Sequence, residues 1–163
     1  MARITAHSPT GRLRRYLAVL AAAIVAFSVA AAAGHAPAAH AAARSTNVTL
    51  VNQTGCDLNL TGQHLSHGRW SIDPPSFIAY GGQATWRSRS AGIATGTEGR
   101  VTYRTSDCDI RDLKQKDVRL HWNNPFVGGN SYDYNGTDPA FRAPHSGGSG
   151  NDANVTFFVQ PNI

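Results

Sequence analysis

The segment Val118-Arg119-Leu120-His121-Trp122 places an apolar residue at every second position. Side chains on a β-strand alternate between two faces, so this pattern predicts a strand with one buried face. The same alternation recurs in four other short runs, which contain Val48 and Leu50, Leu58 and Leu60, Val101 and Tyr103, and Val155, Phe157 and Val159. We therefore expect a protein built from several short strands.

Turn-forming residues separate these runs, among them Thr54-Gly55, Pro74-Pro75, Gly81-Gly82, Asn135-Gly136 and the stretch from Gly147 to Asn151. No segment has a convincing helical period, and Ile110 to Lys116 is predicted to form a surface turn at most. Short strands joined by turns bury their apolar faces by packing one sheet on another. The sequence therefore predicts an all-β fold, an antiparallel β-sandwich, with a long loop over Asn135 to Asp152.

The N-terminal 43 residues have the pattern of a cleaved signal peptide. Arg3, Arg12, Arg14 and Arg15 come before an apolar run from Tyr16 to Ala33, and small residues ending at Ala43 follow it. A basic start, an apolar run and a small-residue cleavage site are typical of export signals. We expect residues 1–43 to be removed and residues 44–163 to form one secreted, extracellular domain.

Net charge argues against a nucleic-acid partner. The whole chain carries +5, but residues 1–43 hold four of its fifteen Lys and Arg and none of its ten Asp and Glu. The remaining part has eleven basic and ten acidic residues, a net charge of +1, scattered in both signs. A nucleic-acid-binding domain would present a basic stripe.

The two cysteines, Cys56 and Cys108, predict a disulfide. An even pair in an oxidising compartment is interpreted first in this way, with two buried thiols as the alternative. On the chain-entropy model, closing a loop of this length stabilises the fold by about 4 kcal/mol.

Motifs for catalysis and metal binding are weak. His64 and His67 are three positions apart, which on a regular strand places them on opposite faces and prevents chelation. The chain has no G-x-S-x-G motif, and its single glutamate, Glu98, is interpreted as a turn or capping carboxylate rather than a glycosidase acid. Gly147 to Asp152 matches one copy of a calcium-binding repeat that functions in stacked copies. We predict no enzyme activity, no catalytic residue, no metal and no cofactor.

Aromatic residues are a stronger signal. Twelve Trp, Tyr and Phe residues follow residue 43, and several lie next to turn formers. Core packing is the default interpretation of each, and Trp70 and Trp86 are expected to be core residues. Aromatic side chains near loops also suit a membrane interface, and they serve equally as stacking platforms for sugars.

Two segments resemble signatures of the aegerolysin family. The first contains Thr95-Gly96-Thr97-Glu98-Gly99, after Gly68-Arg69-Trp70 and Trp86 and before Val101 and Tyr103. The second is His121-Trp122-Asn123-Asn124-Pro125-Phe126, with Asn130, in which a Trp is followed after two residues by Pro and an aromatic residue. The similarity covers about Asn47 to Val159, and it is greatest to the bacterial branch of small insecticidal crystal-protein-like members.

The resemblance implies an actinoporin-like β-sandwich that binds a membrane lipid, often through a sphingolipid headgroup. It also implies that a member can be one component of a two-part cytolysin, in which a larger pore-forming partner protein inserts into the membrane. Fungal members have W-x-C-P-W where this chain has Asn124 and Phe126, so the lipid class stays open. The Cys56 and Cys108 pair is not a recognised family feature.

From the second signature we predict that Trp122 and Phe126 contact the membrane, with Tyr132 and Tyr134 next to them. Two alternatives stay open. One is a lectin-like glycan-binding module that uses the same aromatic residues, and the other is an interaction protein of the cell surface.

Overall fold

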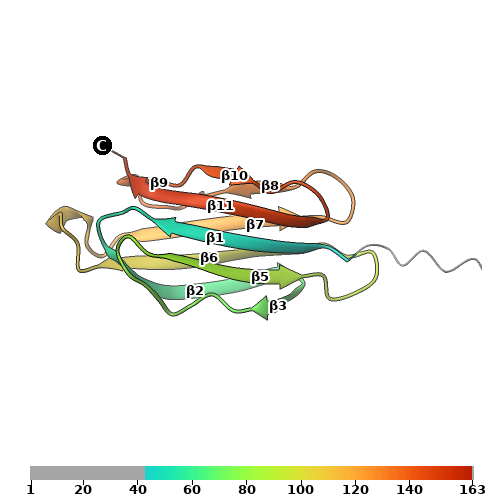
Figure 1. Ribbon diagram of the computed structural model, residues 1–163. Helices are drawn as coiled ribbons and strands as arrows, with labels where there is room; N and C mark the ends of the chain where they lie inside the picture. The colour runs from blue at the N-terminus through green and yellow to red at the C-terminus, as the bar shows by residue number, and fades with distance from the viewer. Residues whose placement is uncertain (1–42, 163) are drawn as a thin grey trace, which may run out of the picture. The chain divides into compact units, whose positions relative to one another are not determined.

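The alternating apolar runs form strands, as the sequence predicts. The computed structural model describes residues 43–162, which form strands β1 to β11 and one short 3-10 helix, η1 (Arg111–Leu113) (Figure 1). The strands are β1 (Ser45–Asn52), β2 (Asp57–His67), β3 (Arg69–Ile72), β4 (Phe77–Ile78), β5 (Gln83–Arg89), β6 (Thr97–Ser106), β7 (Asp117–Asn124), β8 (Ser131–Asp133), β9 (Phe141–Arg142), β10 (His145–Gly147) and β11 (Asp152–Pro161).

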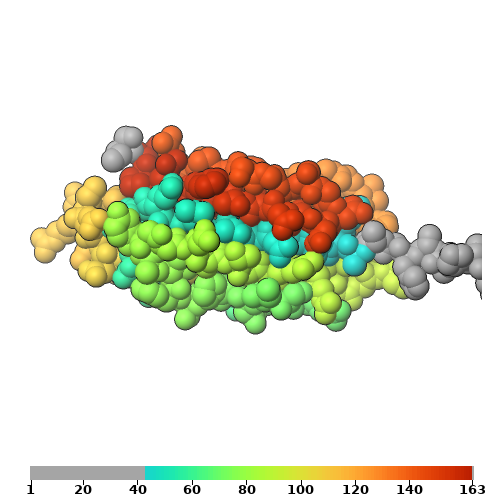
Figure 2. Space-filling view, in the orientation of Figure 1, coloured from blue at the N-terminus to red at the C-terminus, as the bar shows by residue number. Residues whose placement is uncertain are grey.

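Two sheets make up the domain, and the predicted β-sandwich is confirmed. The first has the order β10-β11-β1-β5-β3, with β9 also paired to β11, and the second has the order β4-β2-β6-β7-β8. All pairs are antiparallel except β1 with β11, which run parallel from Ser45 opposite Asp152 to Asn52 opposite Val159. In the space-filling view β11, β1 and β5 form adjacent red, cyan and green bands (Figure 2).

The core lies between the sheets. The residues predicted from the period-two pattern are buried there, including Val48, Leu50, Val101, Val118, Leu120, Val155, Phe157 and Val159. The two largest fully buried side chains are Trp86 of β5 and Trp122 of β7, whose ring centroids are 6.3 Å apart. Trp70 packs partly buried against this pair, 5.7 Å from Trp122. The prediction that Trp70 and Trp86 are core residues is confirmed.

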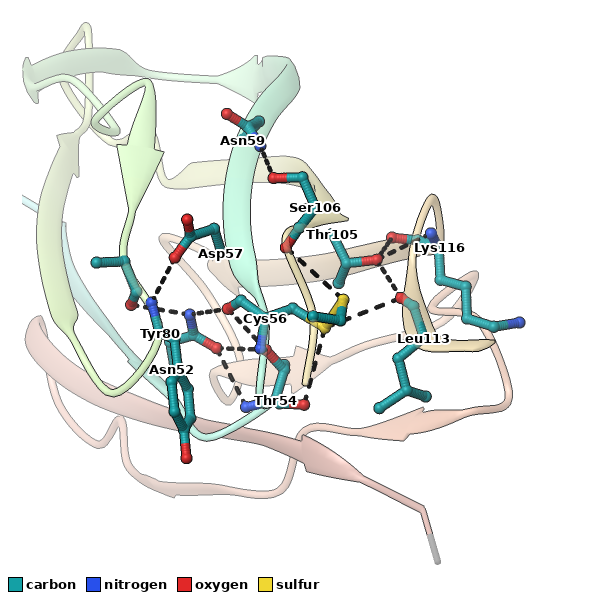
Figure 3. The surroundings of a disulfide bond; sticks show 12 residues. Asn52, Thr54, Cys56, Asp57, Asn59, Tyr80, Thr105, Ser106, Leu113 and Lys116 are labelled. Carbon is teal, nitrogen blue, oxygen red and sulfur yellow. Dashed lines mark hydrogen bonds between the residues drawn. A yellow bond between two sulfur atoms is a disulfide. The ribbon is translucent and has the colours of Figure 1, made fainter. Parts of the chain in front are cut away.

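A disulfide joins Cys56 to Cys108, as the sequence predicts (Figure 3). It connects the start of β2 to the loop after β6, so it links neighbouring strands of the second sheet at one end. Next to it, the buried Asn52 amide donates to the carbonyl oxygens of Cys56 at 2.8 Å and Ala79 at 3.0 Å. These bonds join β1 to two turns at the end that contains the disulfide.

The remaining predictions on local structure have mixed outcomes. The segment expected to be a surface turn contains η1, in agreement with the prediction. The expected long loop over Asn135 to Asp152 is instead interrupted by β9 and β10, which both pair with β11. The predicted signal peptide lies outside the described residues, apart from Ala43. Over the described range, the chain forms no helix that is long and apolar enough to span a bilayer.

Four connections meet at the end opposite the disulfide, which we call the loop end. They are the turn at Gly68, residues 90–96 between β5 and β6, residues 125–130 between β7 and β8, and residues 148–151 between β10 and β11. The start of β1 lies at this end too, because Ser45 pairs with Arg89 and Asp152. The ten residues of β6 separate the loop end from the disulfide end by roughly 33 Å.

Candidate functional site

The two segments that carry the family resemblance lie against each other at the loop end. Thr97 pairs with Asn124, Glu98 with Asn123, and Gly99 with Trp122 between β6 and β7. A Cβ atom on Gly96 would come within 2.6 Å of the Asn124 carbonyl oxygen. The first segment therefore needs glycine at this position so that the chain of the second can pass close by.

A pocket of about 350 Å³ opens where these two segments meet. Glu98 and Phe126 lie on its wall together with His67, Thr95, Gly96, Thr97, Asn123 and Pro125. The pocket thus combines one carboxylate with one aromatic ring and an apolar proline. This chemistry suits a ligand that has both polar and apolar parts.

Two histidines, His67 and His121, lie within 4.0 Å of Glu98 on the outer face of the second sheet. The sequence predicted His64 and His67 on opposite faces, and this is wrong. A register shift between Leu65 and His67 turns His67 to the side of Glu98, while His64 lies opposite Arg100 on that same face. A β-bulge adds one residue to a strand, and the alternation of faces changes there.

Glu98 and His121 form a hydrogen-bonded group with a third residue. His121 Nε2 is 3.2 Å from Glu98 Oε1, and His121 Nδ1 is 2.8 Å from Asp133 Oδ2. Each ring nitrogen therefore faces a carboxylate, which fixes the orientation of the imidazole and the position of Glu98. The described residues contain no cluster of three or more His, Cys, Asp or Glu side chains with the geometry to hold a metal ion.

A larger cleft, of about 640 Å³, lies beside the pocket. It is formed by the start of β1, the loop after β7, β8 and the glycine-rich loop between β10 and β11. Tyr132 of β8 donates through its hydroxyl to the Gly148 carbonyl at 2.7 Å, and its ring lies 5.3 Å from that of His145. Burial raises the pKa of the Tyr132 phenol, so this hydroxyl stays a donor at neutral pH.

The most exposed apolar side chains of the described residues are at the loop end. Ile93 is 89% exposed in the loop after β5, and Val127 is 82% exposed in the loop after β7. Covering such aliphatic side chains with an apolar surface is favourable. They are the apolar part of this surface.

The structure separates the four residues predicted to contact a membrane. Phe126 and Tyr132 line the pocket and the cleft at the loop end. Tyr134 is 40% exposed but lines neither of them. Trp122 is completely buried, and its indole N–H donates to the Ser88 hydroxyl across the two sheets at 2.9 Å. The expectation that Trp122 contacts a membrane does not fit this structure, because its ring fills the core.

Sequence reasoning missed several residues of this end. Ile93 and Val127 were not singled out, although each is an aliphatic residue in a glycine-containing loop. Glu98 was interpreted as a turn carboxylate, whereas it lies on β6 and lines the pocket. Asp152, the last residue of the calcium-like repeat, is paired with Arg87 at 2.8 Å and accepts a hydrogen bond from Ser45.

The geometry defines a β-sandwich domain that carries a pocket, a cleft and exposed aliphatic residues at one end. Two solved structures share this fold with a TM-score of 0.58 each. One is the lipid binding protein Nakanori, at 17% identity over 71% of this chain and 70% of that one. The other is the RahU protein in complex with a Tris molecule, at 14% identity over 77% of this chain and 98% of that one. At identities this low, the similarity supports a shared fold and nothing about function.

Comparison of the sequence adds one relative. An uncharacterized protein of Dictyostelium discoideum is 29% identical over 117 residues, which are 71% of this chain. The matched region is 10% of the length of that protein, so the chain corresponds to a small part of it. No family model matches the sequence.

Proposed function

We propose that this chain is a secreted, non-enzymatic protein that binds membrane lipid through its loop end. The observation that carries the proposal is the pair of exposed aliphatic residues, Ile93 and Val127, on neighbouring loops beside the pocket of Glu98 and Phe126. Nakanori, which shares the fold, is a lipid binding protein, and this supports the same interpretation.

The proposed mode of binding follows from the position of these residues. Ile93 and Val127 enter the boundary between headgroups and acyl chains, where each aliphatic side chain contributes about 1.5 to 3 kcal/mol if it is fully buried. The adjacent pocket then faces the headgroup layer, with the Glu98 carboxylate and the Phe126 ring as its contacts. Lipid selectivity would come from the pocket, and membrane affinity from the two aliphatic side chains.

Secretion is part of this proposal. The arginine-bearing apolar segment before Ala43 supports export, and so does the Cys56–Cys108 disulfide, because disulfides persist in oxidising compartments. Mass spectrometry of the exported protein should give an N-terminus at Arg44. Retention of the first 43 residues would contradict the proposed processing.

A role as one component of a two-part cytolysin extends the proposal. In this version the sandwich binds the lipid and a larger partner protein supplies the membrane-spanning β-structure. Lysis of lipid-matched vesicles should then require both proteins, whereas lysis by this chain alone would contradict the division of roles.

Co-sedimentation with liposomes tests lipid binding. Vesicles of phosphatidylcholine, of phosphatidylcholine with sphingomyelin, and of neutral galactolipid separate a headgroup preference from general attraction to bilayers. We expect binding that depends on one lipid class. Absence of binding to every mixture would contradict the proposal.

Glycan binding is the second candidate, and the cleft beside Tyr132 favours it. An aromatic ring next to amide side chains, here Asn130 and Asn151, is typical of sugar sites. Competition by free sugar, without binding to glycan-free vesicles, would select this function.

A further inference from the structure

The cleft beside Tyr132 contains a positive charge that the described residues do not neutralise. Arg44 lies on its wall at the start of β1. Its Nη1 donates to the Asn151 side-chain oxygen and its Nη2 to the Phe126 carbonyl oxygen at 2.6 Å. Both acceptors are neutral, and the ion pairs within residues 43–162 do not include Arg44.

The carboxylate next to Asn151 in the chain is already occupied. Asp152 follows Asn151 in the chain, but its carboxylate pairs with Arg87 at 2.8 Å and accepts from the Ser45 hydroxyl. The Arg44 Nε atom is buried without a hydrogen-bond partner among the described residues. The guanidinium also lies over the Phe126 ring, 5.7 Å from its centroid, and this ring is uncharged. Because guanidinium stays charged at physiological pH, a partly buried one without a carboxylate partner favours an anionic ligand.

The glycine-rich loop shapes the cleft wall but does not supply the charge. Gly147, Gly148 and Gly150 have φ angles of 77°, 92° and 84°, in the left-handed region that glycine favours. The Gly148 N–H donates to the Asn154 carbonyl oxygen at 2.7 Å, so Arg44 is the group of the cleft that would attract an anion. The loop is fixed, because Asn130 and Tyr132 both donate to the Gly148 carbonyl oxygen at 2.7 Å.

The size of the cleft indicates what carries the anion. A volume of about 640 Å³ lies within the usual range of small-molecule sites and exceeds the needs of a bare ion. Arginine in particular binds phosphate through paired, charge-assisted hydrogen bonds. We propose that this cleft binds the phosphate group of a larger molecule, with the Arg44 guanidinium supplying the charge.

This site goes beyond the proposed lipid binding, because the phosphate can belong to a lipid headgroup or to a soluble phosphate ester. Two probes separate these sources. Glycerol 3-phosphate, titrated calorimetrically, tests the soluble source. Galactolipid vesicles, which contain no phosphate, are compared with the same vesicles carrying a minor fraction of phosphatidic acid.

Two variants remove the site in different ways. Arg44→Gln removes the charge, and Gly129→Phe fills the cleft without changing charge. Gly129 is a suitable position, since it lines the cleft, a Cβ atom there meets nothing within 4 Å, and its φ is not left-handed. Arg100→Gln is the matched control, because Arg100 is an exposed arginine of β6 outside the cleft.

We expect both cleft variants to weaken phosphate binding by about tenfold or more, with Arg100→Gln unchanged. Binding of glycerol 3-phosphate indicates a soluble ester, and Arg44-dependent binding only to phosphatidic acid vesicles indicates a lipid.

Two results would overturn the proposed phosphate site. One is a loss of phosphate affinity in Arg100→Gln that equals the loss in the cleft variants, and the other is absence of binding to both probes. Binding to galactolipid vesicles without any response to phosphate would retain the proposed function and reject this inference alone. Thermal melting of each variant identifies a loss that comes from unfolding, and Gly129→Phe still tests the site if Arg44→Gln does not fold.

Discussion

Gly99 and Trp122 are direct partners across β6 and β7, and the indole ring lies where a side chain on residue 99 would project. A Cβ atom on Gly99 would approach Trp122 Cζ2 and Leu65 Cδ2 to 2.5 Å each. Because the Trp122 ring of the second signature segment occupies this space, residue 99 of the first segment has no room for a side chain. Together they fix the strand pair that carries Glu98 and Phe126.

Gly99→Ala should destabilise the fold by about 1 to 3 kcal/mol, because the added methyl overpacks a buried contact. Urea denaturation measures this difference. Gly129→Ala is the control, since a Cβ atom there meets nothing within 4 Å. Equal stability of both variants would show that Trp122 can move away from β6 at little cost.

Trp122→Ala should cost about 3 to 5 kcal/mol of stability, as expected for removal of a large buried aromatic side chain. Ser88→Ala should cost about 1 to 3 kcal/mol, because it leaves the buried indole N–H of Trp122 without an acceptor. It also removes the 2.7 Å bond from the Thr97 hydroxyl, whose other acceptor, the His67 carbonyl oxygen, is 3.5 Å away. Denaturation curves give both values. Under conditions where each variant is folded, its vesicle binding should equal that of the unchanged protein, and a selective loss of binding in Trp122→Ala would restore Trp122 as a contact residue.

Removal of the disulfide should lower stability by about 4 kcal/mol, because Cys56 and Cys108 are 52 positions apart and the bond limits the unfolded chain. The Cys56→Ser, Cys108→Ser double variant, compared with the oxidised protein by urea denaturation, measures the difference. The difference in unfolding free energy between the two proteins should disappear when both are compared in reductant. A persistent difference there would show that the serines perturb the packing around Asn52.

Acid sensitivity should arise partly at Asp138. The backbone N–H of Ala140 and then the Lys116 ammonium, 3.2 Å away, lower the pKa of this carboxyl in the folded state. Its stabilisation is therefore present above the unfolded pKa of about 4 and is lost as the pH falls through the folded value. Asp138→Asn should be less stable than the unchanged protein at pH 7, by up to about 1 kcal/mol, and the difference should shrink at pH 3. A constant difference between the two pH values would contradict this assignment.

The sequence predicted the fold well because burial of alternate residues is a local pattern. Trp122 illustrates this, since its alternation with Val118 and Leu120 already predicted a core position. The resemblance nevertheless suggested a membrane contact there, and the alternation was the better guide. The bulge at Leu65 to His67 could not be predicted, because register shifts depend on the partner strand.

Less of the candidate site could be predicted from the sequence. Ile93 and Val127 are single aliphatic residues in loops, and their exposure follows from where β5 and β7 end. Arg44 adjoins the predicted cleavage site, and its place in the cleft depends on the pairing of β1 with β11. Such contacts join parts of the chain more than 80 residues apart, as in the bond from Arg44 to the Phe126 carbonyl.

The most direct test of lipid binding through the loop end compares Ile93→Asp and Val127→Asp with Ile110→Asp by vesicle co-sedimentation. Ile110 is the matched control, because it is 49% exposed at the disulfide end, beyond the far end of β6. All three changes are on exposed side chains and should leave the melting temperature unchanged. We expect the two loop-end variants to lose about tenfold in vesicle affinity and Ile110→Asp to bind like the unchanged protein. Equal affinity of all three variants, or a loss confined to Ile110→Asp, would contradict the assignment of the loop end as the membrane-binding surface.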